Sequence, residues 1–444
     1  MSRNYGLLFV LVLALTTVPA AAAPIPPGEA PRPSVGGPRA PAITPEFMGM
    51  AIRDPWYEFN TNLEFPNAPN QAFQDEMGAN LERAGVRRVR LEFHIPVGIT
   101  STEAVNAEIA KNDYFINQVA PRHNLEVLGL LSFDLLRGTE ATLLNTGPFT
   151  VTSKYGGGVN QYMHTWLDRA LMVADHYRDS IAAYEILNEE NRLPPSGAAI
   201  QPQLMGRLLT KFYRFCKNID PSDENHGCGN AQIILGGIHP RGTNDAQKTT
   251  DAQYLQQIYA DASSFGTFKA AHGIFPTDGI AYHPYPEEIR LSPNNAEVDR
   301  GLLRMRQALE AVGDPIKPFW ITEVGYNVGF DFDGPANPRP PQTEMGQAAF
   351  MRDVYTTLSA RQLANGDPEV ANVFWFKYED FPPATGPNAQ QWGIVRIAMP
   401  EGNCEGGCYD PSGQPMFYRQ SFWTYREMAR LPVYRFYLST IGKP

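Results

Sequence analysis

Short apolar runs alternate with longer amphipathic stretches from residue 46 onward. Apolar runs of this length bounded by turn residues predict buried strands, and apolar residues at three- and four-residue spacing predict helices. The predicted strands are 47–52, 86–93, 125–133, 181–187, 231–238, 279–283, 318–324 and 370–377. The predicted helices are 71–84, 103–120, 161–178, 201–217, 251–263, 297–312, 343–362 and 416–430. Several end at turn residues such as Gly85 and Gly313, as helices commonly do.

Eight strands that are each followed by a helix indicate an α/β fold with a parallel sheet, and eight such units match a closed (β/α)8 TIM barrel. The competing fold is an open, doubly wound sheet. It would be expected to carry a glycine-rich phosphate turn after an early strand, and the sequence has none. No strand closely precedes the glycines at 156–158, so this run predicts a loop.

The N-terminal residues have the pattern of a secretory signal. Arg3 gives a positive start, Leu7 to Leu15 form an apolar run, and the alanines at 20–23 favour cleavage after Ala22. The run is shorter than the about 20 residues that a membrane span needs, although an uncleaved anchor helix is the alternative. We therefore expect a signal peptide at 1–22, a Pro/Gly-rich disordered lead at 23–45 and one barrel domain at 46–444.

Composition and charge narrow the classes of protein. The 444 residues are 43% hydrophobic and 19% charged, which excludes a fully disordered chain. The net charge of −10 disfavours nucleic-acid binding, because a polyanion binder needs a concentrated basic surface. We expect an extracellular or periplasmic protein, monomeric, with no membrane contact after signal cleavage.

Export makes disulfide bonds possible for the four cysteines. Four cysteines allow three pairings, and the short spacings favour Cys216–Cys228 and Cys404–Cys408. A zinc site is the alternative. It is disfavoured because the cysteine spacings are not accompanied by paired histidines at ligand intervals.

Two apolar strands end in glutamates. YEILNEEN (184–191) places Glu189 at the tip of the fourth strand, and FWITEVGYN (319–327) places Glu323 at the tip of the seventh. Strand alternation predicts that Leu187 shares a side with Glu189, and Ile321 with Glu323. Because the active site of a barrel lies at the carboxyl ends of its strands, we expect the two carboxylates to converge at the mouth.

Such a pair is what glycoside hydrolysis needs, since one carboxyl donates a proton while the other attacks the sugar or activates water. Two glutamates facing each other in a partly dry mouth are expected to raise the pKa of the acid. The alternative is structural ion pairing with Arg88 or Arg90.

These segments resemble the clan A glycoside hydrolases, most closely family five, with family thirty-nine as neighbour. In that clan an Asn-Glu pair ends the fourth strand and a Glu ends the seventh, which Asn188, Glu189 and Glu323 match. The resemblance spans about residues 46–430 and implies a retaining mechanism without cofactor or metal. It implies Glu189 as acid/base, Glu323 as nucleophile and Asn188 as donor to the sugar 2-hydroxyl.

The resemblance extends to four more positions. Arg90 would keep the nucleophile ionised. His283 and Tyr285, in AYHPYP, match a His-x-Tyr pair in which Tyr contacts the nucleophile and His contacts sugar and acid/base. Trp375 would be the platform beneath the sugar, because an aromatic face suits the apolar side of a pyranose.

The chain departs from the family pattern at two places. Glu190 stands where the clan often has Pro after the acid/base. The histidine of family five near the end of the third strand is missing, where this chain has residues 132–134 (SFD), and His94 is a candidate to replace it.

Other conspicuous residues have open roles. Trp56 and Trp392 follow strands, in positions suited to sugar stacking. Trp320 is expected to pack against outer helices, and His239, after the fifth strand, has no assigned role. Glu379 and Asp380 are either substrate contacts or rim charges.

The sequence predicts a secreted retaining glycoside hydrolase that cleaves β-linked poly- or oligosaccharide of glucan, mannan or xylan type. One alternative is an exo-acting β-glycosidase or β-xylosidase on short oligosaccharides. Another is a non-catalytic carbohydrate-binding barrel, which would be expected to lack one of the two glutamates. A metal-dependent hydrolase would need clustered His and Asp at strand ends, to which His239 and His283 could contribute.

Overall fold

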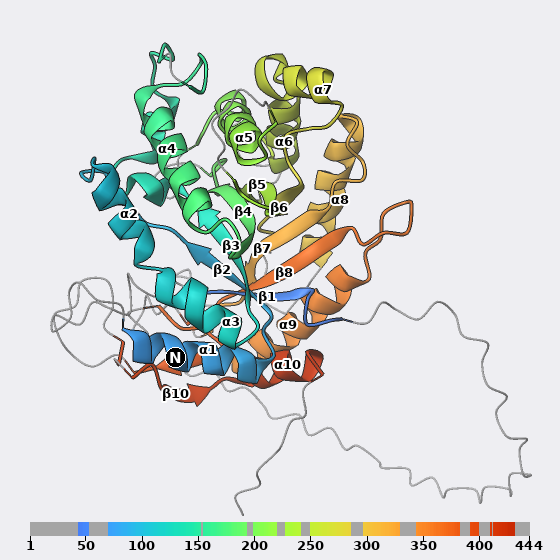
Figure 1. Cartoon of the computed structure of the whole chain (residues 1–444). Coiled ribbons are helices and arrows are strands. Elements are labelled where there is room, and N and C mark those ends of the chain that lie inside the picture. Colours follow the sequence, from blue (N-terminus) through green and yellow to red (C-terminus); the bar gives the residue numbers. More distant parts are fainter. Residues whose placement is uncertain are drawn as a thin grey trace, which may run out of the picture. The chain divides into compact units, whose positions relative to one another are not determined.

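Eight parallel strands form a closed barrel with neighbours in chain order, β1 to β8, in a computed structural model of the chain (Figure 1). This confirms the predicted (β/α)8 barrel. The structure describes residues 43–52, 70–151, 154–192, 199–219, 227–240, 249–285, 296–328, 343–381, 391–398, 409–410 and 412–430. The predicted signal peptide, most of the predicted lead and Trp56 lie outside these residues, as do Cys404 and Cys408.

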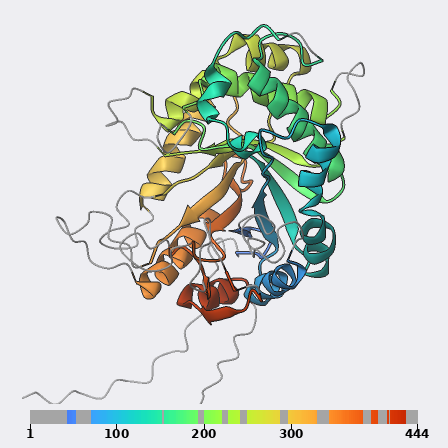
Figure 2. The ribbon, with the colours of Figure 1, turned by 90° about the vertical axis from the view of Figure 1, so that its left-hand side faces the viewer.

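The barrel strands fall within the predicted ranges to within a few residues. They are β1 Met48–Ala51, β2 Arg88–Glu92, β3 Glu126–Leu131, β4 Ile181–Asn188, β5 Gln232–Ile238, β6 Gly279–Tyr282, β7 Phe319–Gly325 and β8 Val370–Phe376. Closure is made by β1, whose Met50 pairs with Val89 of β2 and with Trp375 of β8. Parallel neighbours need long crossovers, which the helices supply around the strands (Figures 1 and 2).

The α-helices are α1 Gln71–Ala84, α2 Thr102–Ala110, α3 Ala120–Arg122, α4 Gln161–His176, α5 Pro202–Cys216, α6 Asp251–Tyr259, α7 Thr267–His272, α8 Ala296–Ala311, α9 Glu344–Ser359 and α10 Gln420–Met428. Short π or 3₁₀ turns are η1 Phe115–Val119, η2 Phe133–Leu136, η3 Ala141–Asn145 and η4 Ala262–Gly266. Local signals set several ends. Asn70 caps α1 by accepting from Phe73 N at 3.0 Å, and Gly85 ends it with φ 87°.

Three predicted helices were wrong in extent, and one of them, 251–263, ends as α6 at Tyr259 before the π turn η4. The stretch 103–120 divides into α2 and the π turn η1, with Pro121 next in the chain. The stretch 416–430 begins as a strand, β10 Pro415–Tyr418, which pairs antiparallel with β9 Val395–Ile397 before α10 starts. The prediction failed because β10 is formed by pairing with another strand, and the spacing of apolar residues within 416–430 carries no information about that pairing.

Trp320 lies inside the barrel, contrary to the prediction that it packs against outer helices. Inward side chains form a separate apolar cluster of Leu128, Ala183, Ile234, Ala281, Trp320 and Phe374. The neighbouring Ile321 belongs to the larger cluster between strands and helices. Alternation along β7 therefore has the opposite phase to the one expected, since Trp320 and not Ile321 points inward.

Glu323 reaches the barrel mouth because the ladder changes register. From an inward Trp320, strict alternation would turn residue 323 outward, but the β7–β8 pairing shifts between Ile321 and Val324. A comparable break occurs in β4, where Leu187 has φ 65° and packs in the outer cluster. Leu187 and Glu189 therefore do not share a side as expected, although both predicted glutamates still arrive at the mouth.

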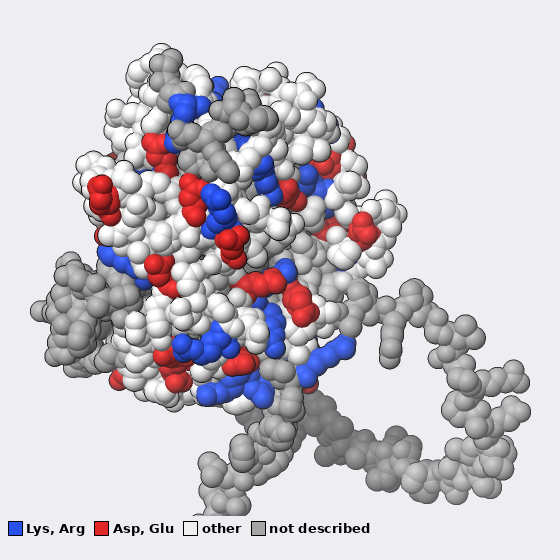
Figure 3. Space-filling model, viewed as in Figure 1, with Lys and Arg blue, Asp and Glu red and all other residues white. Residues whose placement is uncertain are grey.

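Other features of the described residues bear on the remaining predictions. Cys216 and Cys228 form a disulfide with Cα atoms 5.1 Å apart, as predicted. Across the described ranges, no helix has the length and apolarity to cross a bilayer. Acidic and basic side chains intermingle on the face shown in Figure 3.

Truncating Trp320 tests the inward core. Because Trp320 is 4% exposed and fills the barrel interior, Trp320→Ala is expected to lower the free energy of unfolding by about 3–5 kcal/mol. Trp423→Ala is the matched control, since Trp423 is partly buried against the core, and it should cost clearly less. Urea unfolding measures both, and equal losses would contradict the placement of Trp320.

Candidate active site

The Arg90 guanidinium, 5% exposed at the mouth of the barrel, connects three strand ends. Its Nη1 donates to Glu323 Oε1 at 2.6 Å, and its Nε donates to Glu185 Oε2 at 2.6 Å. Nη2 donates to Asn188 Oδ1 at 2.7 Å and to Glu185 Oε1 at 3.2 Å. The two carboxylates outweigh the effect of burial and raise the pKa of Arg90, so the group is a permanent cation.

Glu185 is the fully buried anchor beneath this arginine. Besides the Arg90 contacts, its Oε1 accepts from Gly237 N at 2.9 Å and from Thr322 Oγ1 at 3.0 Å. Burial alone would raise the pKa of Glu185, but the charge of Arg90 and the hydrogen bonds to His283 and Arg90 lower it to about 2. The anion stays charged and holds Arg90 in place.

Glu323 is also contacted by two residues that follow β6. Tyr285 Oη donates to Glu323 Oε2 at 3.0 Å, and His283 Nδ1 lies 3.8 Å from the same oxygen. With Arg90 on Oε1, both carboxylate oxygens of Glu323 have a polar or charged neighbour. The predicted contacts of Arg90 and Tyr285 with Glu323 are therefore present.

His283 is the buried link between the two glutamates. Its Nδ1 lies 3.2 Å from Glu189 Oε1, and its Nε2 lies 3.0 Å from Thr322 Oγ1. Burial by itself lowers the pKa of His283, but the charge of Glu323 and the hydrogen bonds to Glu185 and Glu189 raise it to about 9. A Cβ atom at Gly237 would lie 2.0 Å from Nε2, so only glycine leaves room for this ring.

Glu189 directly follows β4 and lies in the left-handed region, with φ 46°. Its Oε1 lies 3.1 Å from His239 Nδ1, and its Oε2 accepts from Arg192 Nη1 at 2.6 Å. Burial raises the pKa of Glu189, yet the hydrogen bonds and charges of His239 and His283 lower it well below its ordinary value. The expectation that the facing glutamate keeps Glu189 protonated is therefore wrong for the substrate-free protein.

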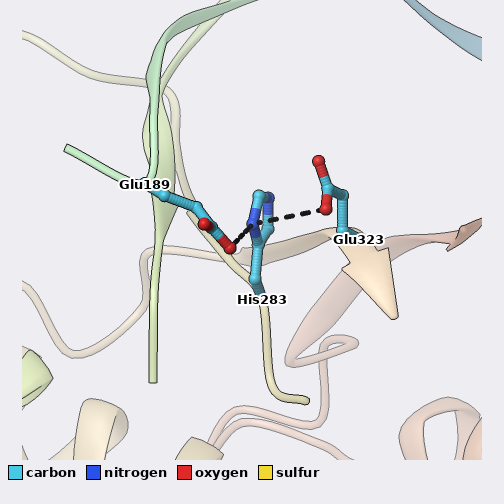
Figure 4. A group of neighbouring side chains, drawn as sticks. All are labelled: Glu189, His283 and Glu323. Carbon is cyan, nitrogen blue, oxygen red and sulfur yellow. Dashed lines mark hydrogen bonds and ion pairs between the residues drawn. The ribbon is translucent and has the colours of Figure 1, made fainter. Parts of the chain in front are cut away.

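The carboxylates of Glu189 and Glu323 converge, with His283 between them (Figure 4). One oxygen of each and a ring nitrogen of His283 all lie within 4.8 Å of one another. Such a trio could ligate a metal ion, but a histidine must be neutral to do so. In the metal-free protein the pKa of His283 is raised to about 9, so its ring is an imidazolium between two carboxylates at neutral pH.

Trp375 is not at the mouth, which corrects its prediction as the sugar platform. It is fully buried on the outer side of β8, with its ring 6.1 Å from Phe350 of α9. The next residue, Phe376, lies 5.6 Å from the ring of Trp392, which in turn lies 5.9 Å from Tyr285. These three rings form an aromatic wall beside Glu323, to which the predicted Trp392 belongs.

Three other predicted candidates have different partners. His94 Nδ1 lies 2.7 Å from Asp134 Oδ2 in a neighbouring polar cluster at the ends of β2 and β3. Glu379 and Asp380 are fully buried in ion pairs with Lys377 and Arg419, respectively. They are therefore structural groups and not rim charges.

Sequence reasoning gave no role to several residues that the structure brings to the site: Glu185, Arg192, Gly237, His239, Thr322 and Phe376. Glu185 carried a signal, because a carboxylate inside an apolar strand needs a buried partner. The contacts of Arg192 and Thr322 depend on turns and register that the pattern does not encode.

Glu190 is buried beside this network with 0% exposure. Neither of its carboxyl oxygens has a hydrogen-bond partner among the described residues. Burial, reinforced by the charges of Glu185 and Glu189, raises its pKa to about 8. Glu190 is therefore a neutral carboxylic acid at pH 7.

Glu190→Gln is expected to change how stability depends on pH. The unfolded chain releases this proton near pH 4.5 and the folded chain near pH 8. As the pH rises between these two values, the free energy of unfolding of wild type therefore falls by about 1.4 kcal/mol per pH unit. The neutral amide has no such loss. The melting temperature of E190Q relative to wild type should therefore rise from pH 5 to pH 8. A difference that stays constant with pH would contradict the assignment, and Glu126→Gln, at an exposed side chain, is the control.

Comparisons with known proteins support the fold. No protein-family model and no curated protein sequence matches the chain. Among solved structures, it is similar to a GH5_18 variant from Streptomyces cattleya in complex with Manβ1-4GlcNAc (15% identity, 86% of this chain and 80% of that chain, TM-score 0.53). It is also similar to a monomeric β-xylosidase from Caulobacter crescentus (15% identity, 87% of this chain and 68% of that chain, TM-score 0.52). A third similar structure is a family 1 β-glucosidase from Thermotoga maritima (14% identity, 87% of this chain and 97% of that chain, TM-score 0.51). At sequence identities this low, the similarity to these structures establishes the barrel fold alone.

Proposed function

We propose that this protein is a secreted retaining glycoside hydrolase that cleaves β-linked carbohydrate. The observation that carries the proposal is the approach of Glu189 and Glu323 to within 4.8 Å, measured between one oxygen of each. Retaining enzymes place their two carboxyl groups about 5–5.5 Å apart, whereas inverting enzymes need about 6.5–9.5 Å to admit a water molecule. The likeness to solved glycosidases with the same fold adds support.

In the first step, an oxygen of Glu323 attacks the anomeric carbon and the bond to the leaving oxygen breaks. Glu189, once protonated, gives its proton to that oxygen. Arg90 and Tyr285 hold the attacking carboxylate in place. Because Arg90 donates to Asn188 Oδ1, the amide nitrogen of Asn188 is left to donate to the sugar 2-hydroxyl.

In the second step, water attacks the anomeric carbon of the glycosyl-enzyme. Glu189 takes a proton from this water, and the ester bond to Glu323 breaks to release the carboxylate. Two inversions at the same carbon retain the β configuration. No step needs a cofactor.

The aromatic wall of Tyr285, Phe376 and Trp392 favours a pyranose as substrate. Rigid aromatic faces suit the apolar side of a sugar ring, and the neighbouring carboxylates suit its hydroxyls. Glucan, mannan and xylan chains all present such rings, so a panel of these polysaccharides and the corresponding aryl β-glycosides is the substrate set to test.

Glu323→Ala and Glu189→Ala separate the two roles. Glu323→Ala should abolish hydrolysis, and added azide should yield the α-glycosyl azide because the small anion attacks once. Glu189→Ala should lower kcat/KM about 10²–10⁴-fold on substrates with poor leaving groups and little on 2,4-dinitrophenyl glycosides, which leave without acid assistance. Its kcat on dinitrophenyl glycosides should still fall, because the second step loses its base. Rates and product configuration are measured by chromatography and NMR.

Glu126→Ala is the matched control, because Glu126 starts β3 and pairs with Arg88 away from the mouth. It should keep wild-type rates. Wild-type activity in either alanine variant at 189 or 323, or inversion by the wild type, would refute the proposed mechanism.

A further inference from the structure

His239 is held rigidly at the end of β5 by the chain that follows Glu189. Asn191 Nδ2 donates to His239 O at 2.8 Å, and His239 N donates to Asn191 Oδ1 at 2.8 Å. Asn191 is 2% exposed, so this reciprocal pair is shielded from water. It fixes the main chain of His239 and brings its ring to the Glu189 carboxylate.

The carboxylate of Glu189 has nitrogen groups at both oxygens. The Nδ1 atoms of His239 and His283 lie 3.1 and 3.2 Å from Oε1, and Arg192 Nη1 lies 2.6 Å from Oε2. Arg192 reaches Oε2 from the turn that Glu189 itself begins, since Arg192 N donates to Glu189 O at 2.8 Å. Such donors stabilise the carboxylate and oppose its protonation.

The three nitrogen groups differ in exposure. His283 is fully buried and is also bound to Thr322, whereas the side chains of His239 and Arg192 are 27% and 40% exposed. Because the side chains of His239 and Arg192 reach solvent, they can move away from Glu189 and be hydrated when a sugar enters. The contact with His283 stays in place.

We propose that His239 and Arg192 are positioning residues that hold Glu189 as a carboxylate in the substrate-free enzyme, and that opening of these contacts lets Glu189 act as the acid. This inference rests on the proposed function. The remaining charged or titratable groups around Glu189 are common to both states: Glu185, Glu190, Glu323, Arg90, His283 and Tyr285.

The consequence is a shift of the pH profile. Removing a group that favours the carboxylate raises the pKa of Glu189, so the free enzyme keeps its acid to higher pH. The basic limb of kcat/KM, which reports the acid of the free enzyme, should then move to higher pH. Above the wild-type limb, the rate should rise about tenfold for each pH unit that the limb moves.

The experiment compares full pH profiles of kcat/KM for wild type, Arg192→Met and His239→Leu. It uses the phenyl and 2,4-dinitrophenyl β-glycosides of a sugar that wild type hydrolyses. Both variants should shift the basic limb upward with the phenyl substrate, which needs the acid, and leave the dinitrophenyl rate above the wild-type limb unchanged. Arg192→Lys and His239→Asn keep a donor at each position and should restore most of the wild-type profile.

Two variants serve as matched controls. Arg178 makes the same three-residue pair with Asp175 at 43% side-chain exposure, and His176 pairs with Asp113 at 31% exposure, both away from the mouth. Arg178→Met and His176→Leu should leave the profile unchanged. Melting temperatures establish that every variant is folded.

The outcomes distinguish the two proposals. Unshifted basic limbs in both Arg192→Met and His239→Leu, or an equal loss of rate with both leaving groups at every pH, would overturn the positioning role while leaving the hydrolase standing. A wild type that hydrolyses no glycoside of the panel would overturn the proposed function itself.

Discussion

The guanidinium of Arg90 joins β2, β4 and β7 at one buried point, and the candidate site depends on it. Its partners Glu185, Asn188 and Glu323 lie up to 233 positions from Arg90 in the chain. Removing one partner of such a buried pair leaves an uncompensated charge, which costs about 3–5 kcal/mol. The barrel mouth is therefore organised before any substrate arrives, because its charges fix one another.

This organisation makes the two facing glutamates chemically unequal. Glu323 is bound by the buried Arg90 guanidinium and by the partly buried Tyr285 hydroxyl. Glu189 is held partly by His239 and Arg192, which reach the surface. An acid must gain and lose a proton during the reaction, and the exposure of His239 and Arg192 matches that requirement.

Local sequence patterns predicted the fold and the two central residues well, because both depend on short-range signals. Apolar runs predicted all eight strands, and glycines predicted several helix ends. The polar residues at the ends of the fourth and seventh strands pointed to Glu189 and Glu323. The predictions failed where a shift of one residue along a strand decides which side of the strand a side chain faces. Trp375 and Trp320 were assigned to the wrong sides of their strands, since alternation has two phases and sequence alone does not fix which one faces inward. The contacts of Thr322 and Gly237 with Glu185 were missed because they join strands far apart in the chain.

The most direct test of the central claim is to trap the covalent intermediate. In a 2-deoxy-2-fluoro β-glycoside the fluorine slows both steps of the reaction, and a dinitrophenyl leaving group speeds only the first step. A retaining enzyme therefore accumulates the glycosyl-enzyme. Mass spectrometry of the digested protein should then find one added sugar on the peptide that contains Glu323. A label on another residue, or turnover of the natural substrate with inversion and no label, would contradict the account.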